Sequence, residues 1–103
     1  MKIIFNKKIY DTDQATEITS VRYATPNNLA WFREDLYRSR NGAWFIVGVG
    51  GPLSHYAVEL EDGIREGRRR LTPMSSDETI AWLEKHGKYS VIEDHFSDWL
   101  EIA

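Results

Sequence analysis

Residues 36–47 read Leu-Tyr-Arg-Ser-Arg-Asn-Gly-Ala-Trp-Phe-Ile-Val, two strand-like runs separated by Asn-Gly. Asn41 and Gly42 both tolerate positive φ, which a type I′ turn requires at its two central positions, and the twist of that turn matches the twist of paired strands. We therefore predict a β-hairpin that turns at this dipeptide. Its second strand, residues 43–47, is apolar on both faces, so we expect it at the centre of a sheet.

The segment before this hairpin contains two further local signals. Residues 2–10 hold two short apolar runs around a polar dipeptide, which suits a tight opening hairpin. Residues 11–13, Asp-Thr-Asp, provide side-chain oxygens that can accept from the free amides of a first helical turn. We therefore expect a short helix that buries Ala15 and Ile18 and ends near Thr19.

The segment after the hairpin is rich in glycine and turns. Residues 48–52, Gly-Val-Gly-Gly-Pro, are expected to end the strand, and residues 53–57 to form a structured loop or a single helical turn. A turn at residues 61–63 then leads into residues 64–71, which we predict to be an edge strand. Arginines on such a strand discourage pairing with other chains.

The C-terminal third predicts two helices. Ser75 and Glu78 have the spacing of a capping box, and Gly87 suits the end of the helix that follows. A second amphipathic helix is indicated by inward-facing residues at helical spacing, namely Val91, Ile92, His95, Phe96, Trp99 and Leu100. We predict one α+β domain over residues 1–103, with a small antiparallel sheet, two C-terminal helices and one short N-terminal helix.

Composition narrows the class of protein. The 103 residues include no cysteine, which excludes disulfides, thiolate metal sites and a cysteine nucleophile. Apolar residues make up 42% of the chain, enough to build a core and to argue against disorder. The apolar run at the N-terminus is too short for a signal peptide or a membrane span. We expect a cytoplasmic protein with no membrane contact.

No group of residues has the pattern of a catalytic or cofactor site. The glycines of residues 48–51 lack the register and the Gly-Lys-Ser/Thr ending of phosphate-binding loops. Ser54 and His55 are adjacent, and adjacent residues rarely converge as nucleophile and base. His55, His86 and His95 lack the spacing of metal ligands. We therefore expect no catalytic residue, no metal and no cofactor, and we predict that the protein is not an enzyme.

Charge is distributed unevenly around a net value of −3. Residues 65–70 contain four arginines and a single acidic residue, Glu66. The arginines are Arg65, Arg68, Arg69 and Arg70. Each guanidinium can bind a phosphate, so this run is a candidate nucleic-acid contact, although a solvated edge strand or an acidic partner explains it equally well.

The last quarter of the chain is acidic. Its candidate partner-binding residues are Asp77, Glu84, Glu93, Asp94, Asp98 and Glu101. Carboxylates along an exposed helix face can present negative charge to a basic groove and compete there with nucleic acid. The same charges also serve solubility on any amphipathic helix, and the sequence does not choose between these two roles.

Several motifs together resemble a family of small bacterial proteins common on phages and integrative elements. They lie between about Tyr10 and His86: Tyr10-Asp11-Thr12-Asp13-x-Ala15-x-x-Ile18, Leu36-Tyr37-Arg38, Gly42-x-Trp44-Phe45, Gly48-x-Gly50-Gly51-Pro52-x-Ser54-x-Tyr56-Ala57, Pro73-Met74 and Ala81-Trp82-x-Glu84-x-His86. The arginine run and the acidic C-terminus depart from the family pattern, so relatives need not share an activity that depends on them.

Small acidic proteins of mobile elements include anti-CRISPR inhibitors. The resemblance therefore implies an origin on a mobile element. Our leading hypothesis, inferred from that origin, is that the chain binds a CRISPR-Cas effector complex or nuclease and blocks its nucleic-acid or subunit site, with the acidic residues as contacts. The alternative hypothesis is a small DNA- or RNA-binding regulator that uses the arginine run.

Overall fold

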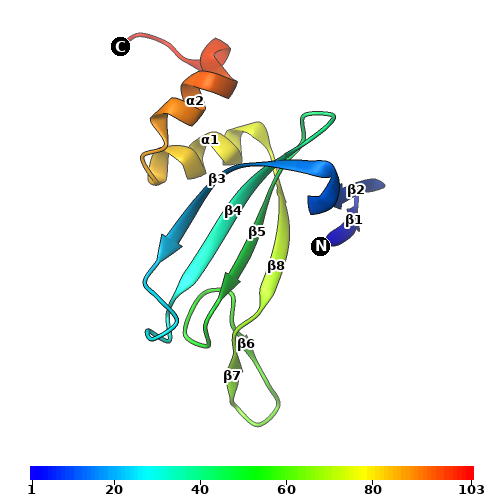
Figure 1. Ribbon diagram of the computed structural model, residues 1–103, viewed down its shortest axis with the longest axis vertical. Coiled ribbons are helices and arrows are strands. Elements are labelled where there is room, and N and C mark those ends of the chain that lie inside the picture. Colours follow the sequence, from blue (N-terminus) through cyan, green and yellow to red (C-terminus); the bar gives the residue numbers. More distant parts are fainter.

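The computed structural model describes residues 1–103 and has a mixed α+β architecture (Figure 1). Antiparallel strands form one four-stranded sheet and two separate two-stranded sheets, and two helices follow them in sequence. The molecule is elongated and thin, with principal dimensions of 50 × 34 × 20 Å. Both helices and the C-terminus lie at one end of the large sheet (Figure 1). Neither helix has the length and apolar character that crossing a membrane requires.

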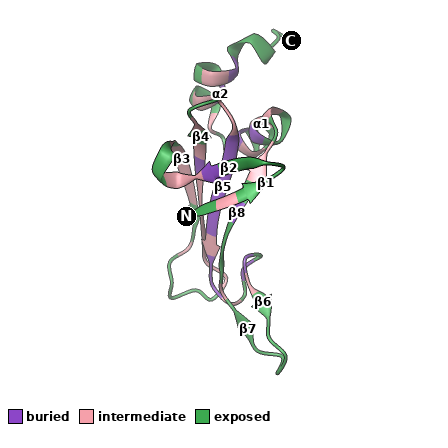
Figure 2. Cartoon of the chain, turned by 90° about the vertical axis from the view of Figure 1, so that its right-hand side faces the viewer, coloured by how far each residue is buried: buried purple, intermediate pink, exposed green.

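The large sheet is built around one buried strand. Its members, in spatial order, are β3 (Ala15–Tyr23), β4 (Phe32–Ser39), β5 (Trp44–Gly50) and β8 (Arg69–Met74). β5 pairs on both sides, and Phe45 within it is completely buried. Figure 2 shows that buried residues are concentrated along this strand. The prediction of a central strand is confirmed. The side chains of β5 point alternately to the two faces of the sheet, and both faces are covered, so both sets of apolar side chains are buried.

The turn between β4 and β5 differs from the predicted one. Gly42 has a φ of +85°, but Asn41 does not adopt positive φ. The Gly42 amide donates to the Ser39 carbonyl at 3.0 Å, and the Ala43 amide donates to Ser39 Oγ at 3.0 Å. The loop therefore has three residues, with glycine in the left-handed position. The hairpin is confirmed and the type I′ turn is wrong, because the Ser39 side chain provides an acceptor that favours the longer loop.

The predicted short N-terminal helix, which was to bury Ala15 and Ile18 and end near Thr19, is wrong. Asp11 accepts from the Asp13 amide at 3.0 Å, but this caps only a single 3-10 turn, η1 (Thr12–Gln14). Ala15 is already extended, and it starts the nine-residue strand β3. That strand contains four β-branched residues: Thr16, Ile18, Thr19 and Val21. Such side chains favour strands, and pairing with β4 outweighs the local capping signal.

The predicted N-terminal hairpin is confirmed. β1 (Lys2–Phe5) and β2 (Lys8–Asp11) are antiparallel, and Asn6 and Lys7 between them have φ values of 50° and 64°. Tyr10 packs edge-on against Phe45, with ring centroids 5.7 Å apart. This contact belongs to a buried cluster of Tyr10, Phe45, Val47 and Leu71. The hairpin therefore covers part of the sheet face that Phe45 occupies.

The opposite face of the sheet packs against the helices. α1 (Ser76–Lys85) begins with the predicted capping box, since Ser75 Oγ accepts from the Glu78 amide at 3.0 Å and Glu78 Oε1 accepts from the Ser75 amide at 2.9 Å. Gly87 has a φ of +66° beyond its end. The main buried cluster joins sheet and helices: Leu36, Trp44, Ile46, Leu83, Ile92 and Phe96.

The second helix is shorter than predicted. α2 (Tyr89–Phe96) buries Ile92 and Phe96, and a separate 3-10 turn follows as η2 (Ser97–Trp99). Trp99 is 56% exposed and Leu100 is 49% exposed, so the prediction that both pack inward is wrong. Ser and Asp at the start of η2 favour turns over helix interiors, because their short side chains compete for backbone hydrogen bonds.

The predicted edge strand over residues 64–71 is divided in two. β7 (Arg65–Glu66) pairs only with β6 (Val58–Glu59), whereas β8 is an edge strand of the large sheet. The break falls at Gly67, whose backbone packs so closely on the Gly50 carbonyl that a Cβ atom would overlap it. The edge-strand prediction therefore holds only from Arg69 onward.

Candidate functional site

The acidic residues of the C-terminal quarter are exposed but do not share one helix face. Glu93 and Asp94 lie on α2, Asp98 lies in η2, and Glu101 follows it in extended chain. Asp77 and Glu84 are exposed on α1. None of the six carboxylates forms a salt bridge. The second predicted helix would have carried Glu93, Asp94, Asp98 and Glu101 together, but α2 ends at Phe96 and carries only the first two. We refer to these six residues as the acidic surface.

Exposed apolar side chains interrupt the acidic sequence at the C-terminus. Trp99 and Leu100 are about half exposed, and Ile102 is fully exposed. They alternate along the chain with Asp98 and Glu101. An indole beside carboxylates is a chemically suitable contact for a protein surface that combines basic and apolar groups.

The arginine run does not form one surface. Arg65 donates from Nε to the Pro52 carbonyl at 3.0 Å, and Arg68 donates from Nε to Glu66 at 2.8 Å. Arg69 and Arg70 are consecutive residues of β8 and therefore point to opposite faces of the sheet. Arg70 lies over Tyr56, with its guanidinium carbon 4.8 Å from the ring centroid.

A partly buried polar cluster surrounds Glu34, a residue that the sequence alone did not single out. Glu34 lies on β4, and its side chain is only 12% exposed. Trp82 of α1 donates from Nε1 to its Oε1 at 3.0 Å, and the Tyr56 hydroxyl donates to its Oε2. His55 Nε2 lies 3.4 Å from the same Oε2. We call these four residues the Glu34 cluster, and it ties the sheet to the helix layer and to the loop of residues 51–57.

The Glu34 cluster holds its two acidic groups in fixed protonation states. Burial alone would raise the pKa of Glu34, but hydrogen bonds from Tyr56, Trp82 and His55 outweigh burial and leave the pKa below its ordinary value of 4.5. Burial, followed by the hydrogen bond to Glu34, raises the pKa of Tyr56 above its ordinary value of 10.0. At neutral pH the carboxylate is therefore charged and the phenol keeps the proton that it donates.

The space beside the Glu34 cluster is small. The adjoining hollow measures about 180 Å³, and its wall includes Ile46, Arg70, Thr72 and Met74. Sites for small molecules usually measure roughly 300–1,000 Å³. All buried side-chain nitrogen and oxygen atoms of the protein have hydrogen-bond partners. We assign the cluster a structural role, because its polar groups are satisfied by one another.

The glycine-rich segment makes room for this cluster. A Cβ atom at Gly48 would overlap the Tyr56 ring, and one at Gly50 would overlap the Ser54 side chain. Ser54 Oγ in turn donates to the Gly51 carbonyl at 2.7 Å. The glycines therefore allow the loop to fold back against β5. The sequence shows a glycine at position 48 and a tyrosine at position 56. Only the fold shows that the glycine leaves space for the tyrosine ring.

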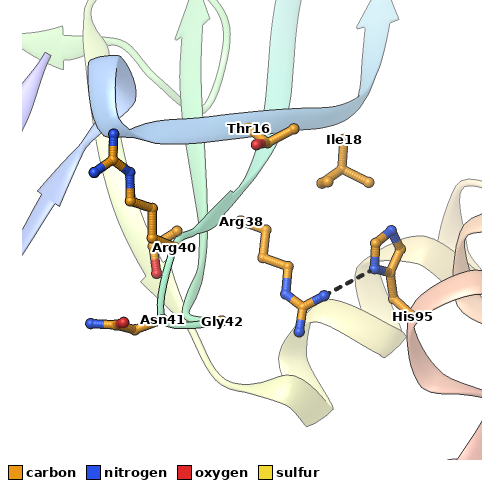
Figure 3. A pocket seen from close by; sticks show the side chains of 8 residues that line it. Thr16, Ile18, Arg38, Arg40, Asn41, Gly42 and His95 are labelled. Carbon is orange, nitrogen blue, oxygen red and sulfur yellow. Dashed lines mark hydrogen bonds between the residues drawn. The ribbon is translucent and has the colours of Figure 1, made fainter.

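The largest hollow of the protein, about 560 Å³, opens between the β4–β5 turn and α2 (Figure 3). Arg38 and His95 face each other across it, and Arg38 Nη1 lies 3.3 Å from His95 Nδ1. The Arg38 guanidinium carbon is also 5.2 Å from the Trp44 ring centroid. Thr16, the cross-strand partner of Arg38, and Ile18 line the same hollow. Arg38 has no carboxylate partner.

Comparisons with known proteins identify no relative of the chain. No family model matches the chain, and neither does any curated protein or solved structure. Within the structure, no group of three or more His, Asp or Glu side chains is arranged to hold a metal ion.

Proposed function

We propose that the protein is an inhibitor that acts by binding another protein, and that its acidic surface occupies a basic, nucleic-acid-binding site on that partner. The observation that carries the proposal is a set of exposed carboxylates without salt bridges, two of which, Asp98 and Glu101, alternate along the chain with the exposed Trp99, Leu100 and Ile102. Carboxylates that served only the internal electrostatics of the fold would be expected to face its lysines or arginines.

The two kinds of side chain have complementary roles in such a contact. Carboxylates steer a basic partner toward the surface and set the orientation of docking, mainly through the association rate. Trp99 and its apolar neighbours would provide the buried centre of the interface, where most of the binding free energy arises. A surface used only for solubility needs the charges but gains nothing from an exposed indole.

The proposed target class is a CRISPR-Cas effector complex or a nuclease. The motifs that resemble small mobile-element proteins suggest this class, and both targets carry basic channels for nucleic acid. On this proposal the inhibitor forms a protein–protein complex without catalysis, and it needs no cofactor. The acidic surface would then exclude the nucleic-acid substrate from the channel.

The test compares two variants that lose the same amount of charge. One carries Glu93→Gln, Asp94→Asn, Asp98→Asn and Glu101→Gln. The control changes four exposed acids elsewhere: Asp13→Asn, Glu59→Gln, Glu61→Gln and Asp62→Asn. Each protein is added to DNA cleavage assays with purified CRISPR effectors and nucleases, and complexes are isolated by size-exclusion chromatography.

We expect the unmodified protein and the control variant to block cleavage by one of these enzymes, and the C-terminal variant to lose inhibition. Equal inhibition by the two variants would refute a role for the acidic surface. Failure of the unmodified protein to bind any of these enzymes would refute the target class. Capture of nucleic acid alone, with an affinity that falls steeply with salt, would instead favour a regulator that uses its arginines.

A further inference from the structure

We propose that Arg38 forms a binding site for one carboxylate group of the partner protein, next to the acidic surface. The proposal deepens the function proposed above and rests on it for the identity of the partner. It is carried by the position of the Arg38 guanidinium in the largest hollow of the molecule, between the β4–β5 turn and α2.

The guanidinium of Arg38 is held in place before any ligand binds. An arginine has no acceptor, so Arg38 Nη1 donates to His95 Nδ1, and the Trp44 ring supports the guanidinium from another side. His95 itself packs edge-on against Trp44, with ring centroids 5.3 Å apart. These contacts lower the entropy cost of ordering this long, exposed side chain, which favours binding.

Most hydrogen-bonding capacity of Arg38 is unused. A guanidinium has five N–H donors in a planar fork, and only the contact with His95 engages one of them in the structure. The planar fork matches the two oxygens of a carboxylate in a bidentate pair. Thr16 lies beside Arg38 in register and adds a hydroxyl donor to the same hollow.

The surroundings favour a single carboxylate over a nucleic-acid backbone. Asp94 immediately precedes His95 on α2, and Glu93 and Asp98 are close to it in sequence. None of these carboxylates lines the hollow, so a carboxylate that enters it meets no like charge there. Arg40, the other arginine that lines the hollow, points away from His95 in Figure 3, so the site offers one guanidinium.

The partner would therefore present a carboxylate flanked by basic side chains. The basic groups would face the acidic surface and the carboxylate would face Arg38. Such alternation of charge sets the register of an interface and disfavours partners that are uniformly basic. Arg38 would then determine specificity within the proposed interface.

Two short peptides test the site. One is acetyl-Lys-Lys-Glu-Lys-Lys-amide, and the other has glutamine at its centre and is otherwise identical. Binding to ¹⁵N-labelled protein is followed by NMR at low salt, including the Nε–Hε signal of Arg38. We expect the glutamate peptide to bind more tightly, by up to about fivefold, as for an exposed ion pair. Arg38→Gln should abolish this preference, Arg38→Lys should reduce it, and Arg40→Gln should leave it unchanged.

If Arg38 does not bind a carboxylate, the glutamine peptide should bind more tightly than the glutamate peptide. It carries one more net positive charge and is attracted more strongly to the acidic surface. Equal or tighter binding of the glutamine peptide would overturn the proposal, as would loss of the preference in Arg40→Gln. A titration with sodium acetate, compared with sodium chloride, tests whether Arg38 binds a carboxylate that carries no basic groups for the acidic surface. The Arg38 Nε–Hε signal is the readout. If neither peptide binds but acetate shifts the Arg38 signal saturably, the acidic surface fails and the Arg38 site stands. If acetate also has no effect beyond chloride, the Arg38 site is refuted.

Discussion

Removing the Glu34 carboxylate should be among the most damaging single changes in the protein. Glu34→Ala deprives the Trp82 Nε1 and Tyr56 hydroxyl donors of their acceptor at partly buried positions. A hydrogen bond to a charged group contributes about 1.5–3 kcal/mol, and release of the carboxylate's own burial cost offsets part of the loss. We expect a net cost of about 3 kcal/mol in the free energy of unfolding.

The pH dependence of the free energy of unfolding distinguishes the contribution of the Glu34 charge from that of the shape of its side chain. Its pKa is lowered in the folded state, so the charged form stabilises the fold above the unfolded value of about 4.5. That contribution is lost as the pH falls below 4.5 and through the folded pKa. Glu34→Gln keeps the shape but cannot titrate. Its stability should therefore fall less than that of the unmodified protein between neutral pH and pH about 3.

The assay is urea denaturation at several pH values, followed by tryptophan fluorescence, with thermal melts as a check. A loss of about 3 kcal/mol corresponds to a fall of about 12–24 °C in the melting temperature for a domain of this size. Glu59→Gln, an exposed carboxylate of β6, is the control and should change little. If Glu34→Ala costs no more than this control, or if Glu34→Gln and the unmodified protein respond identically to acid, the Glu34 cluster does not stabilise the fold as described.

Three further predictions concern the backbone and are measured by the same denaturation. Gly48→Ala should lower the free energy of unfolding by about 3 kcal/mol, because the new methyl group displaces the Tyr56 ring. This cost should largely disappear in a Tyr56→Ala background. An unchanged cost in that background would refute the steric explanation. Ser75→Ala should cost about 1 kcal/mol through loss of the cap on Glu78, and the absence of any loss would contradict the capping box. Lys7→Gly should stabilise the first hairpin by about 1 kcal/mol by relieving a left-handed backbone, and destabilisation would refute this reasoning.

The fold could be predicted from the sequence where one local signal dominates. The strand that starts at Trp44 could be placed at the centre because its apolar side chains point both ways, and the structure buries them on both faces. The capping box at Ser75 and Glu78 was equally reliable, because its two hydrogen bonds join residues three apart.

Predictions failed where local and long-range forces disagree. Asp11 provides helix-capping chemistry, and the structure uses it, yet the following residues pair with β4 instead of forming a helix. Trp99 and Leu100 continue the helical spacing, but α2 ends before they can be buried. After Asp11 the hydrophobic pattern fits either a helix or a strand, and pairing with β4 selects the strand. At Trp99 and Leu100 the pattern fits a longer helix, but the end of α2 prevents it.

The Glu34 cluster could not be predicted for a different reason. Glu34 lies between charged residues in a strand, where a carboxylate is ordinarily assigned to solvent. Its partner Trp82 is 48 residues away and is a suitable core residue without any polar contact. The Arg38–His95 contact spans 57 residues and was hidden in the same way.

The close approach of Gly48 to Tyr56 also constrains how this sequence can diverge. A relative with any side chain at position 48 could keep the fold only if position 56 carried a smaller residue, and Glu34 would then lose the phenol that burial makes essential. The three positions should thus change together or remain together. A relative that retains only one of them would be expected to have repacked the boundary between its sheet and its first helix.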